Sequence, residues 1–345
     1  MTRPARKHQA DPQWGAPADA RKTRPVQDWS QGVSIIVPTY KRPDGIRIAL
    51  NSLMGQSAGA RAVEIIIADN DPLGSAEAFV KTFAKTALTE IIYRHVPEPG
   101  VSNARNGALD AARGRFIAFL DDDMDALPGW LEELVKASLK YKAAITFGPA
   151  RAVMPNKDDP LNPYMAPFFS RVADAPEGYI EKCLGTGGCL LDLSLCQMPS
   201  PAFDPIHNET GGEDDALFHH LQENGAKVAW AIKAESYEIV PASRATPAYM
   251  WKRNFAFGQG PTQEQADKGA AGTIGIAKWM SIGALQLCIY GPLYLGLKLL
   301  GRPKYIHFHN RTAQALGKIC WWSSFTQKLY GVNATTGAIN GANAS

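Results

Sequence analysis

Three consecutive carboxylates follow an apolar stretch that runs from Phe116 to Leu120; they are Asp121, Asp122 and Asp123. Such a stretch is typical of a buried strand, and open α/β sheets bind ligands beyond the carboxyl ends of their strands. Carboxylates this close repel one another, so a bound divalent cation is the simplest partner that keeps them ionised. The alternative is an acidic loop before a helix that Pro128 begins, with Asp125 as its cap. The surrounding motifs favour a metal site and a diphosphate-bearing substrate.

A second acidic cluster follows Gly211-Gly212 and comprises Glu213, Asp214 and Asp215. These residues begin a helix with an apolar face, and the helix dipole favours acids there, so capping alone would explain them. The functional interpretation is that one carboxylate acts as a general base facing the metal site. Sugar transfer with inversion needs such a base to take the proton of an acceptor hydroxyl, and a metal-bound diphosphate as leaving group. We choose Asp214, and Glu213 and Asp215 remain alternatives.

The elements that must position these acids alternate between strand and helix. We expect strands at 33–37, 63–68, 91–95 and 116–120, separated by helices at 44–54, 75–87 (capped by Ser75) and 101–113. This rhythm predicts a mostly parallel, Rossmann-like sheet flanked by helices. A helix at 129–141 and a strand at 145–148 follow. Residues 150–181, rich in Pro and aromatics, are expected to be loops. Later elements are expected at 188–193, 213–224, 228–231 and 237–240.

Four loops leave the same edge of this sheet, and each carries polar residues. A nucleotide needs groups that bond its base, a wall beside it and cations for its phosphates. Asp69 suits a base or ribose contact, although Asp69-Asn70-Asp71-Pro72 is also a ready turn former. Arg42 and Arg105 could reach phosphates, and Asp123 could hold the metal; a solvated helix face is the alternative for Arg105. The full candidate set for the donor is Pro38, Thr39, Tyr40, Arg42, Asp69, Asn103, Arg105, Asp121 and Asp122, with Asp123 on the metal.

The composition and the absence of certain motifs argue against several classes of protein. The net charge of +3 is too small to argue for a nucleic-acid partner. Pro38-Thr39-Tyr40 stands where a dinucleotide-binding domain would carry Gly-x-Gly-x-x-Gly, and there is no Walker loop. The five cysteines lack metal-type pairing and suit reduced thiols in a cytosol. Residues 1–31 are expected to form a disordered basic tail without the apolar core of a signal peptide, and 333–345 a disordered end.

The ordered motifs resemble those of a known family. They are Val33-Ser-Ile-Ile-Val-Pro-Thr-Tyr-Lys-Arg, Asp69-Asn-Asp, Gly100-Val-Ser-Asn-Ala-Arg-Asn, Phe119-Leu-Asp-Asp-Asp and Gly212-Glu-Asp-Asp-Ala-Leu-Phe. Together they are similar to the inverting family 2 glycosyltransferases, and more narrowly to bacterial exopolysaccharide glucosyltransferases of the succinoglycan type. The resemblance covers about residues 33–259. It implies a GT-A fold over 32–262, a UDP-sugar donor, and Mg²⁺ or Mn²⁺.

The resemblance also implies roles for single residues. Asp69 resembles the nucleoside contact, Arg105 the donor-site basic residue, and Asp121 and Asp123 the two ends of an Asp-x-Asp motif. Asp214 resembles the base. Gly187 lies in a glycine-rich strand beside the acceptor, with a tight turn as the alternative, and Glu213 is placed on the acceptor side. Trp251 belongs to a basic-aromatic segment after the catalytic core; Trp130, Trp230 and Trp251 are candidate platforms for sugars, with a core position as the alternative for each.

Residues 263–332 are expected to be helical and to touch a membrane. The stretch from Trp279 to Leu297 is uncharged and nearly long enough to span a bilayer, but Gly291-Pro292 interrupts it. Lys and Arg lie on both sides, so a shallow or re-entrant segment is favoured over a single crossing. Trp321, Trp322, Phe325 and Tyr330 suit the headgroup level. A buried helix pair packed on the domain is the alternative.

These observations predict a metal-dependent inverting hexosyltransferase. It would move a sugar, which the resemblance implies to be glucose, from a UDP-sugar to a lipid-linked oligosaccharide at the cytoplasmic face of the inner membrane, in exopolysaccharide or cell-surface glycan synthesis. Two rivals remain. A sugar-nucleotide nucleotidyltransferase would share the sheet and the acids but would carry a glycine-rich triphosphate loop after the first strand. A noncatalytic scaffold of polysaccharide assembly could retain the fold.

Overall fold

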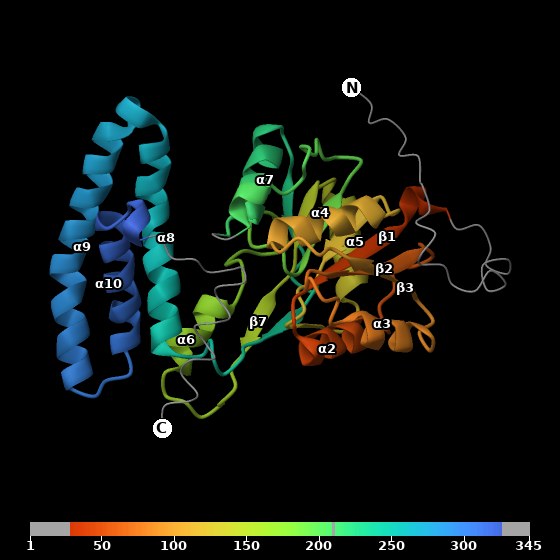
Figure 1. Cartoon of the computed structure of the whole chain (residues 1–345), viewed down its shortest axis with the longest axis horizontal. Helices are drawn as coiled ribbons and strands as arrows, with labels where there is room; N and C mark the ends of the chain where they lie inside the picture. The colour runs from red at the N-terminus through yellow and green to blue at the C-terminus, as the bar shows by residue number, and fades with distance from the viewer. Residues whose placement is uncertain (1–27, 209–210, 326–345) are drawn as a thin grey trace.

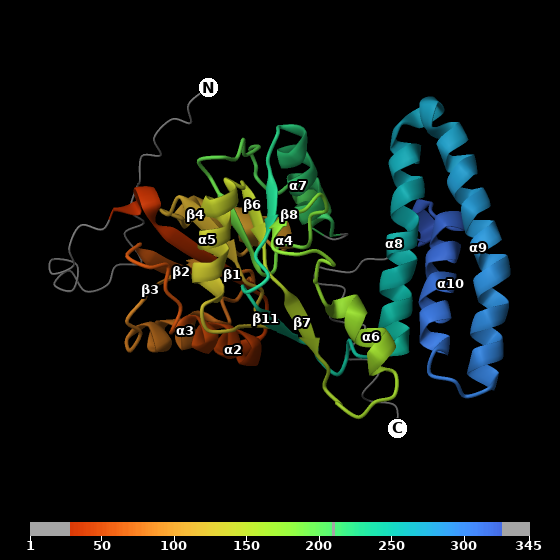
Figure 2. The same cartoon turned by 180° about the vertical axis from the view of Figure 1, so that it is seen from behind.

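The computed structural model describes residues 28–208 and 211–325. An α/β core holds most of the chain, and three long helices stand beside it as a separate layer (Figures 1 and 2). Nearly all of the expected N-terminal tail, the expected end at 333–345 and Tyr330 lie outside the described residues. The core carries both acidic motifs, so its sheet decides where they meet.

The central sheet has eight strands in the order β3-β2-β1-β4-β9-β6-β10-β8. Its parallel part comprises β1 (Val33–Thr39), β2 (Val63–Asp69), β3 (Glu90–His95) and β4 (Phe116–Phe119). Next comes β9 (Cys189–Asp192), antiparallel to both β4 and β6 (Ile145–Phe147). The last pair is β10 (Val228–Trp230), parallel to β6, and β8 (Gly178–Tyr179), antiparallel to β10. The predicted mostly parallel α/β class is confirmed.

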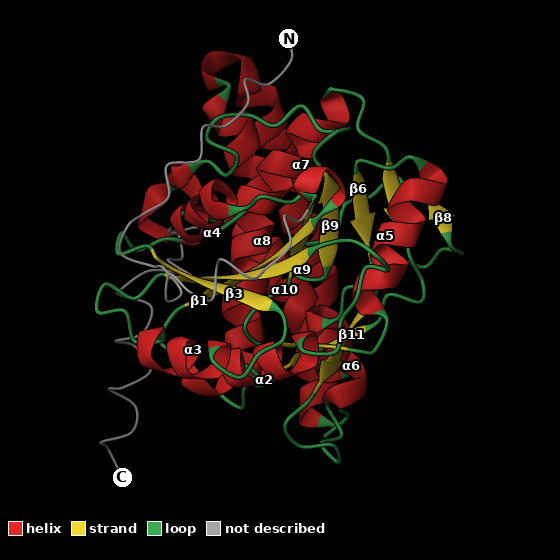
Figure 3. Ribbon diagram, turned by 90° about the vertical axis from the view of Figure 1, so that its right-hand side faces the viewer, coloured by secondary structure: helices red, strands yellow, loops and turns green. Residues whose placement is uncertain are grey.

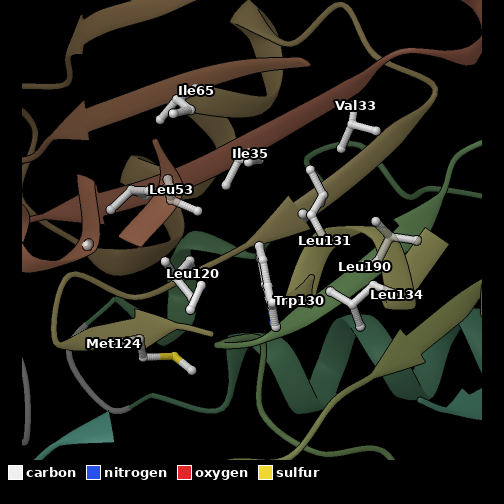
Figure 4. Close-up of a cluster of buried hydrophobic side chains, with 14 of the residues drawn as sticks. Val33, Ile35, Leu53, Ile65, Leu120, Met124, Trp130, Leu131, Leu134 and Leu190 are labelled. Atoms are coloured by element: carbon white, nitrogen blue, oxygen red, sulfur yellow. The ribbon is translucent and has the colours of Figure 1, made fainter. Parts of the chain in front are cut away.

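Helices cover both faces of this sheet (Figure 3). One face carries α2 (Pro43–Leu53), α3 (Glu77–Ala84) and α5 (Trp130–Tyr141), and the other carries α4 (Val101–Ala111) and α7 (Glu213–Glu223). Strands buried on both faces are apolar at most positions, which explains the apolar runs in the sequence; two buried exceptions, Ser34 and Glu64, pair with each other, the hydroxyl donating to the carboxylate at 2.6 Å. In β1, for example, Ile35 faces the first layer and Ile36 the second. Figure 4 shows the first layer, where Trp130 and Leu131 of α5 pack against Ile35 and Leu190.

A small second sheet lies at the edge of the core. It has the order β5 (Met124–Ala126), β11 (Ser236–Ile239), β7 (Ala150–Val153), and the helix α6 (Asn162–Phe169) follows β7. The expectation of loops throughout 150–181 was therefore wrong, since β7, α6 and β8 lie there. Asp125 is in β5 and caps no helix; α5 begins after Gly129, whose φ is +87°. Ser75 caps no helix either, because α3 begins after Ala76.

Three helices form the C-terminal layer: α8 (Pro247–Asp267), α9 (Thr273–Leu299) and α10 (Tyr305–Ile319). Close contacts join α8 to α10, because a Cβ on Gly258 would lie 2.2 Å from the carbonyl oxygen of Gln314. The first helix runs unbroken through the boundary expected between 262 and 263. Short 3₁₀ turns complete the described elements: η1 (Trp29–Gln31), η2 (Pro205–His207), η3 (Gly269–Gly272) and η4 (Ser323–Phe325).

The outermost helix, α9, is exposed over most of its length (Figure 1). Within the described residues, it is the one helix that is long and apolar enough to cross a membrane. Together with η3 it spans Gly269–Leu299, and an 18-residue stretch within it has a mean hydropathy of 1.4 and is 6% buried. The expected interruption at Gly291-Pro292 does not occur, because α9 continues to Leu299 with Pro292 inside it. Ring contacts to α10 flank the proline: Tyr290 with Phe308 and Tyr294 with Tyr305, each at 6.2 Å between centroids.

Candidate active site

The loop after β4 places Asp122 against the end of β1. The Thr39 hydroxyl donates to Asp122 Oδ2 at 2.9 Å, and the Arg42 guanidinium donates to Asp122 Oδ1 at 2.8 Å. The helix α2 comes close enough for this because its first turn contains Gly45, where a Cβ would lie 2.6 Å from the Asp122 carbonyl oxygen. The Pro-Thr-Tyr-Lys-Arg loop and the Asp motif, 80 residues apart, therefore form one polar cluster.

The Asp123 carboxylate accepts hydrogen bonds from two arginines that are far apart in the sequence. Arg42 donates to Asp123 Oδ2 at 2.8 Å, and Arg244, from the segment between β11 and α8, donates to the same oxygen at 3.1 Å. The backbone N–H of Ile239 also donates to the Asp123 carbonyl oxygen at 2.7 Å, which joins this loop to β11. Two cations therefore neutralise the carboxylate predicted to hold a metal.

Burial and charge act in opposite directions in this cluster. Burial raises the pKa of Asp122 to about 6 and the negative charge of Asp123 adds to the rise, while the charge of Arg42 limits it. Burial lowers the pKa of Arg42, but the charges of Asp122 and Asp123 outweigh this and raise it overall. Arg42 therefore stays protonated at any physiological pH, and Asp122 becomes protonated under mildly acidic conditions.

Arg105 connects the two acidic motifs. This guanidinium, whose side chain is 7% exposed, forms an ion pair with Glu213 at the start of α7 and another with Asp121 after β4, at 3.4 Å. It lies over the ring of Phe203, 5.5 Å from the centroid. Burial raises the pKa of Glu213, opposed by the charge of Arg105. Residues far apart in the sequence thus meet at the carboxyl edge of the sheet, as the strand ends predicted.

Asp214 lies beside this bridge, across the turn that precedes β9. Its Oδ2 accepts the backbone N–H of Thr186 at 3.2 Å, and its Oδ1 accepts the N–H of Asp215 at 3.0 Å. The same turn touches the Asp motif, because a Cβ on Gly187 would lie 2.3 Å from Asp121 Oδ2. Consecutive residues, Thr186 and Gly187, therefore contact Asp214 and Asp121. Asp214, the predicted base, and the Asp motif thus lie on the same side of the molecule.

Comparisons with known proteins agree with this geometry. The model of the family "Glycosyl transferase family 2" matches residues 34–190. The succinoglycan biosynthesis protein ExoM of Rhizobium meliloti is 33% identical over 228 residues, 66% of this chain and 73% of ExoM. The chain belongs to glycosyltransferase family 2. The resemblance noted in the motifs is thereby confirmed, and the protein is a glycosyltransferase of glycan biosynthesis.

More distant matches cover parts of the enzyme. The UDP-Glc:alpha-D-GlcNAc-diphosphoundecaprenol beta-1,3-glucosyltransferase WfgD of Escherichia coli is 28% identical over 135 residues, 39% of this chain and 51% of WfgD. Among solved structures, S. aureus TarS 1-349 in complex with UDP is 15% identical, with a TM-score of 0.46, over 82% of this chain and 90% of TarS 1-349.

Asp69 in this glycosyltransferase sits at the end of β2 as expected, but its side chain is fully buried. One oxygen accepts the N–H of Asp71 at 3.0 Å, and the other accepts the N–H of Ala76 at 2.8 Å and the hydroxyl of Tyr93 at 2.9 Å. The carboxylate thus orders the loop between β2 and α3. The nucleoside contact stays a prediction, and it would require this loop to rearrange or to contact the nucleoside through its backbone.

The remaining predicted residues of the glycosyltransferase lie around this edge. Asn103 is in the first turn of α4, where its side-chain amide donates to the Pro99 carbonyl at 3.3 Å. Pro38 ends β1 with Thr39, and Tyr40 carries Lys41 over its ring at 5.2 Å. Trp251 lies in α8, against His309 of α10 at 4.8 Å between ring centroids. Trp130 and Trp230 are core residues, so the core alternative holds for both rings.

The metal stays a prediction for this glycosyltransferase, and a metal at these acids would be shared with a substrate. Within 28–208 and 211–325, no group of three or more His, Cys, Asp or Glu side chains is placed to hold a metal ion. Mg²⁺ in nucleotide enzymes usually binds one or two carboxylates together with substrate phosphates and water, so it needs no such group. Asp123 with Asp121 would supply the carboxylates, and Arg42 and Arg244 already show that a positive charge is stable here.

Two arginines of the site escaped the sequence analysis. Arg171, after α6, donates to Glu238 at 2.7 Å and to the Gly187 carbonyl at 3.2 Å, so it backs the turn that touches Asp121. Arg244 reaches Asp123 from three residues before α8 begins. Neither lies in a recognisable motif, and their acidic partners are at least 67 residues away in the sequence. A search for isolated arginines near the ends of predicted strands would have included Arg244, which follows β11.

Proposed function

We propose that this family 2 glycosyltransferase transfers a sugar from a UDP-sugar, with glucose as the first candidate, to a lipid-linked oligosaccharide with inversion. The observation that carries the proposal is the bridge of Arg105 between Asp121 and Glu213, with Asp214 next to it. It supports a donor site at the Asp motif and a proton acceptor at the start of α7. A single displacement at the anomeric carbon needs these two groups at opposite sides of one sugar.

The donor's diphosphate would bind between the strand ends and the two exposed arginines. Arg42 and Arg244 have side chains 33% and 29% exposed, and both already hold an anionic oxygen. Phosphate oxygens suit the planar guanidinium fork of arginine. Mg²⁺ or Mn²⁺, held by Asp123 and the diphosphate, would stabilise the charge that develops on the leaving group. In WfgD the donor is UDP-Glc by name, which makes UDP-glucose the first donor to test.

Asp214 would take the proton of the acceptor hydroxyl. Its carboxylate accepts hydrogen bonds from two backbone N–H groups, which orient it. Arg105 holds the neighbouring Glu213, so Glu213 is tied to a structural pair while Asp214 has no ion pair in the described residues. Among the three candidate carboxylates, this favours Asp214 as the base.

The acceptor would be a polyprenyl-diphosphate-linked oligosaccharide at the cytoplasmic face of the inner membrane. The exposed apolar helix α9 supports contact with a lipid surface. WfgD, by name, acts on a diphosphoundecaprenol-linked sugar, which supports the acceptor class. The loops at the carboxyl edge of the sheet would then contact the acceptor's hydroxyl outside the lipid headgroup layer.

The test is a transfer assay with the purified full-length chain. It combines each of a panel of labelled nucleotide-sugars with membrane lipid extract, with Mg²⁺, Mn²⁺ or chelator. We expect label in the lipid fraction, with UDP released, for UDP-glucose and divalent metal. Pyrophosphate release from a nucleoside triphosphate would instead identify a nucleotidyltransferase. Nucleotide binding without hydrolysis or transfer across the panel would identify a scaffold.

A further inference from the structure

A hollow opens at the same edge of the sheet as the active site. Its volume is about 370 Å³, near the lower end of the roughly 300–1,000 Å³ typical of small-molecule sites. It lies between the segment 172–176 and the residues that follow β6 and end β10. Both strands run in the direction of β4, because β9 is antiparallel to β4 and to β6. The hollow and the Asp motif therefore lie beyond the carboxyl ends of strands of one sheet.

The lining of this hollow is apolar with a few polar groups. Trp230 is 1% exposed, and its indole Nε1 is buried without a hydrogen-bond acceptor among the described residues. Buried donors in proteins are nearly always paired, so this N–H marks a place for an acceptor atom. Val172 and Ile232, 41% and 43% exposed, form apolar rims. Arg151 and Asp174 also line the hollow and are exposed, which gives its mouth one donor and one acceptor side chain.

Arg171 joins this hollow to the active site. Its backbone pairs with Ala150 through two hydrogen bonds, of 2.8 and 2.9 Å, and its guanidinium holds the Gly187 carbonyl beside Asp121. The next residue, Val172, lines the hollow. The five residue steps from Arg171 to Pro176 span at most about 18 Å. A chain of sugars with its reacting hydroxyl at Asp214 can therefore extend toward the hollow.

We propose that this hollow binds a hexopyranose ring of the acceptor glycan, an inference that rests on the proposed function of the active site. A pyranose has apolar C–H faces and a rim of hydroxyls, and each hydroxyl both donates and accepts. The hollow offers apolar rims at Val172 and Ile232 and polar side chains at Arg151 and Asp174, and beneath them lies Trp230, whose indole N–H is buried without an acceptor among the described residues. Arg151 is paired with Glu235 at 3.9 Å and Asp174 adds a second carboxylate, so in the described part of the chain no unpaired cation at the mouth attracts a phosphate group and a neutral sugar is favoured.

The first test measures sugar binding without catalysis. Saturation-transfer NMR on the full chain uses cellobiose, maltose and methyl β-glucoside as probes, in the presence of UDP to fill the donor site. We expect a signal for at least one probe that the Arg151→Ala/Asp174→Ala variant loses and the control Arg47→Ala/Asp110→Ala keeps. The control removes the same side-chain types from exposed positions of α2 and α4. Equal signals in both variants, or no signal from any probe on the wild type, would overturn the proposal.

The second test uses kinetics with the lipid-linked acceptor. The rim variant should raise the acceptor KM about tenfold and leave the donor KM and the hydrolysis of UDP-sugar unchanged. Trp230→Phe, which keeps an aromatic ring but removes the indole N–H, should act in the same direction; if it does not fold, the rim variant decides. Sugar binding that depends on the rim in a chain without transfer would refute the proposed function alone. An unchanged acceptor KM would refute the subsite.

Discussion

Asp214 carries the proposed chemistry, and Asp214→Asn tests it with little change of shape. The asparagine keeps one oxygen that can accept from Thr186 or Asp215, so the local backbone should persist. We expect transfer to fall by about 10²–10⁴-fold, as for removal of a general base, with the Kd for UDP unchanged. A labelled transfer assay and calorimetric titration with UDP measure the two quantities.

Asp215→Asn is the matched control, because it changes the same atoms one residue away in the first turn of α7. Desolvation by the surrounding chain raises the pKa of Asp215, and the negative charge of Asp214 raises it further. We expect this variant to retain most of its activity. A large loss in Asp215→Asn with wild-type turnover in Asp214→Asn would move the base to Asp215.

The buried pair of Arg105 and Glu213 should be strongly coupled in stability. Removing one partner leaves a buried charge uncompensated, which typically costs about 3–5 kcal/mol. Arg105→Met and Glu213→Gln should each lower the free energy of unfolding by an amount in this range. The double variant should lose clearly less than the sum, since neither charge then remains unpaired, although Asp121 still lacks its arginine. Denaturant unfolding of all four proteins measures the coupling, and additive losses would contradict the pairing.

The raised pKa of Asp122 gives a prediction for the pH dependence of stability. Its value is about 6 in the folded chain against 3.8 in the unfolded one, so between these pH values the folded state holds more protons. The free energy of unfolding should therefore fall as pH rises from about 4 to 6, by up to about 3 kcal/mol from this group. Asp122→Asn should reduce that slope, as measured by denaturant unfolding at several pH values. An identical slope in both proteins would refute the shift.

At the scale of elements, the sequence predicts the first half of the sheet because each strand contains an apolar run and each crossover helix is amphipathic. The direction of β9 could not be predicted, since a short apolar run looks the same in either direction. The helix α6 was missed because Pro167 stands inside it, where proline usually argues against a helix, and β7 and β8 are only four and two residues long. Pro292 misled in the same way, although ring contacts with α10 support α9 on both sides of it.

The acidic residues of the candidate site could be located from the sequence, but two of its arginines could not. Strand ends locate carboxylates, because the carboxyl edge of a parallel sheet gathers the loops that follow it. Arginine partners come from wherever the fold returns the chain, so Arg171 and Arg244 could not be assigned from local pattern. The role of Arg105 also changed in emphasis, from a phosphate contact to a bridge between Asp121 and Glu213. The phosphate contact of Arg105 stays a prediction.

The turn before β9 should tolerate no side chain at Gly187. A Cβ there would lie 2.3 Å from Asp121 Oδ2 and 2.8 Å from the Arg171 guanidinium, so Gly187→Ala must displace one of them. A shift of about 1 Å in a catalytic group can lower the rate about 10²-fold. We expect a loss of this order in kcat with a small change in the unfolding midpoint. Gly55→Ala, where a Cβ meets nothing within 4 Å, is the control and should retain full activity.

At the scale of the whole molecule, the active site and the helical layer are joined by a short connection. Arg244 binds Asp123, and three residues later α8 begins, capped by the hydroxyl of Thr246 on the N–H of Tyr249. The start of the helical layer is therefore held close to the Asp motif, because only a few residues separate Arg244 from α8. A surface that binds α9 would place the active site at a defined height above it, which suits an acceptor anchored in that surface.

The outer face of α9 should bind lipid. Leu285 and Ile289, 65% and 50% exposed, are one turn apart on this helix, and replacing both with Asn removes apolar area without adding charge. Burying each side chain is worth about 1.5–3 kcal/mol, so the double variant should bind vesicles of phosphatidylethanolamine and phosphatidylglycerol at least about tenfold more weakly. Leu73→Asn/Leu88→Asn, at exposed positions in loops of the core, should bind like the wild type. Co-sedimentation measures both; equal vesicle binding together with a loss of self-association in ultracentrifugation would show that a second copy of the chain covers this face instead.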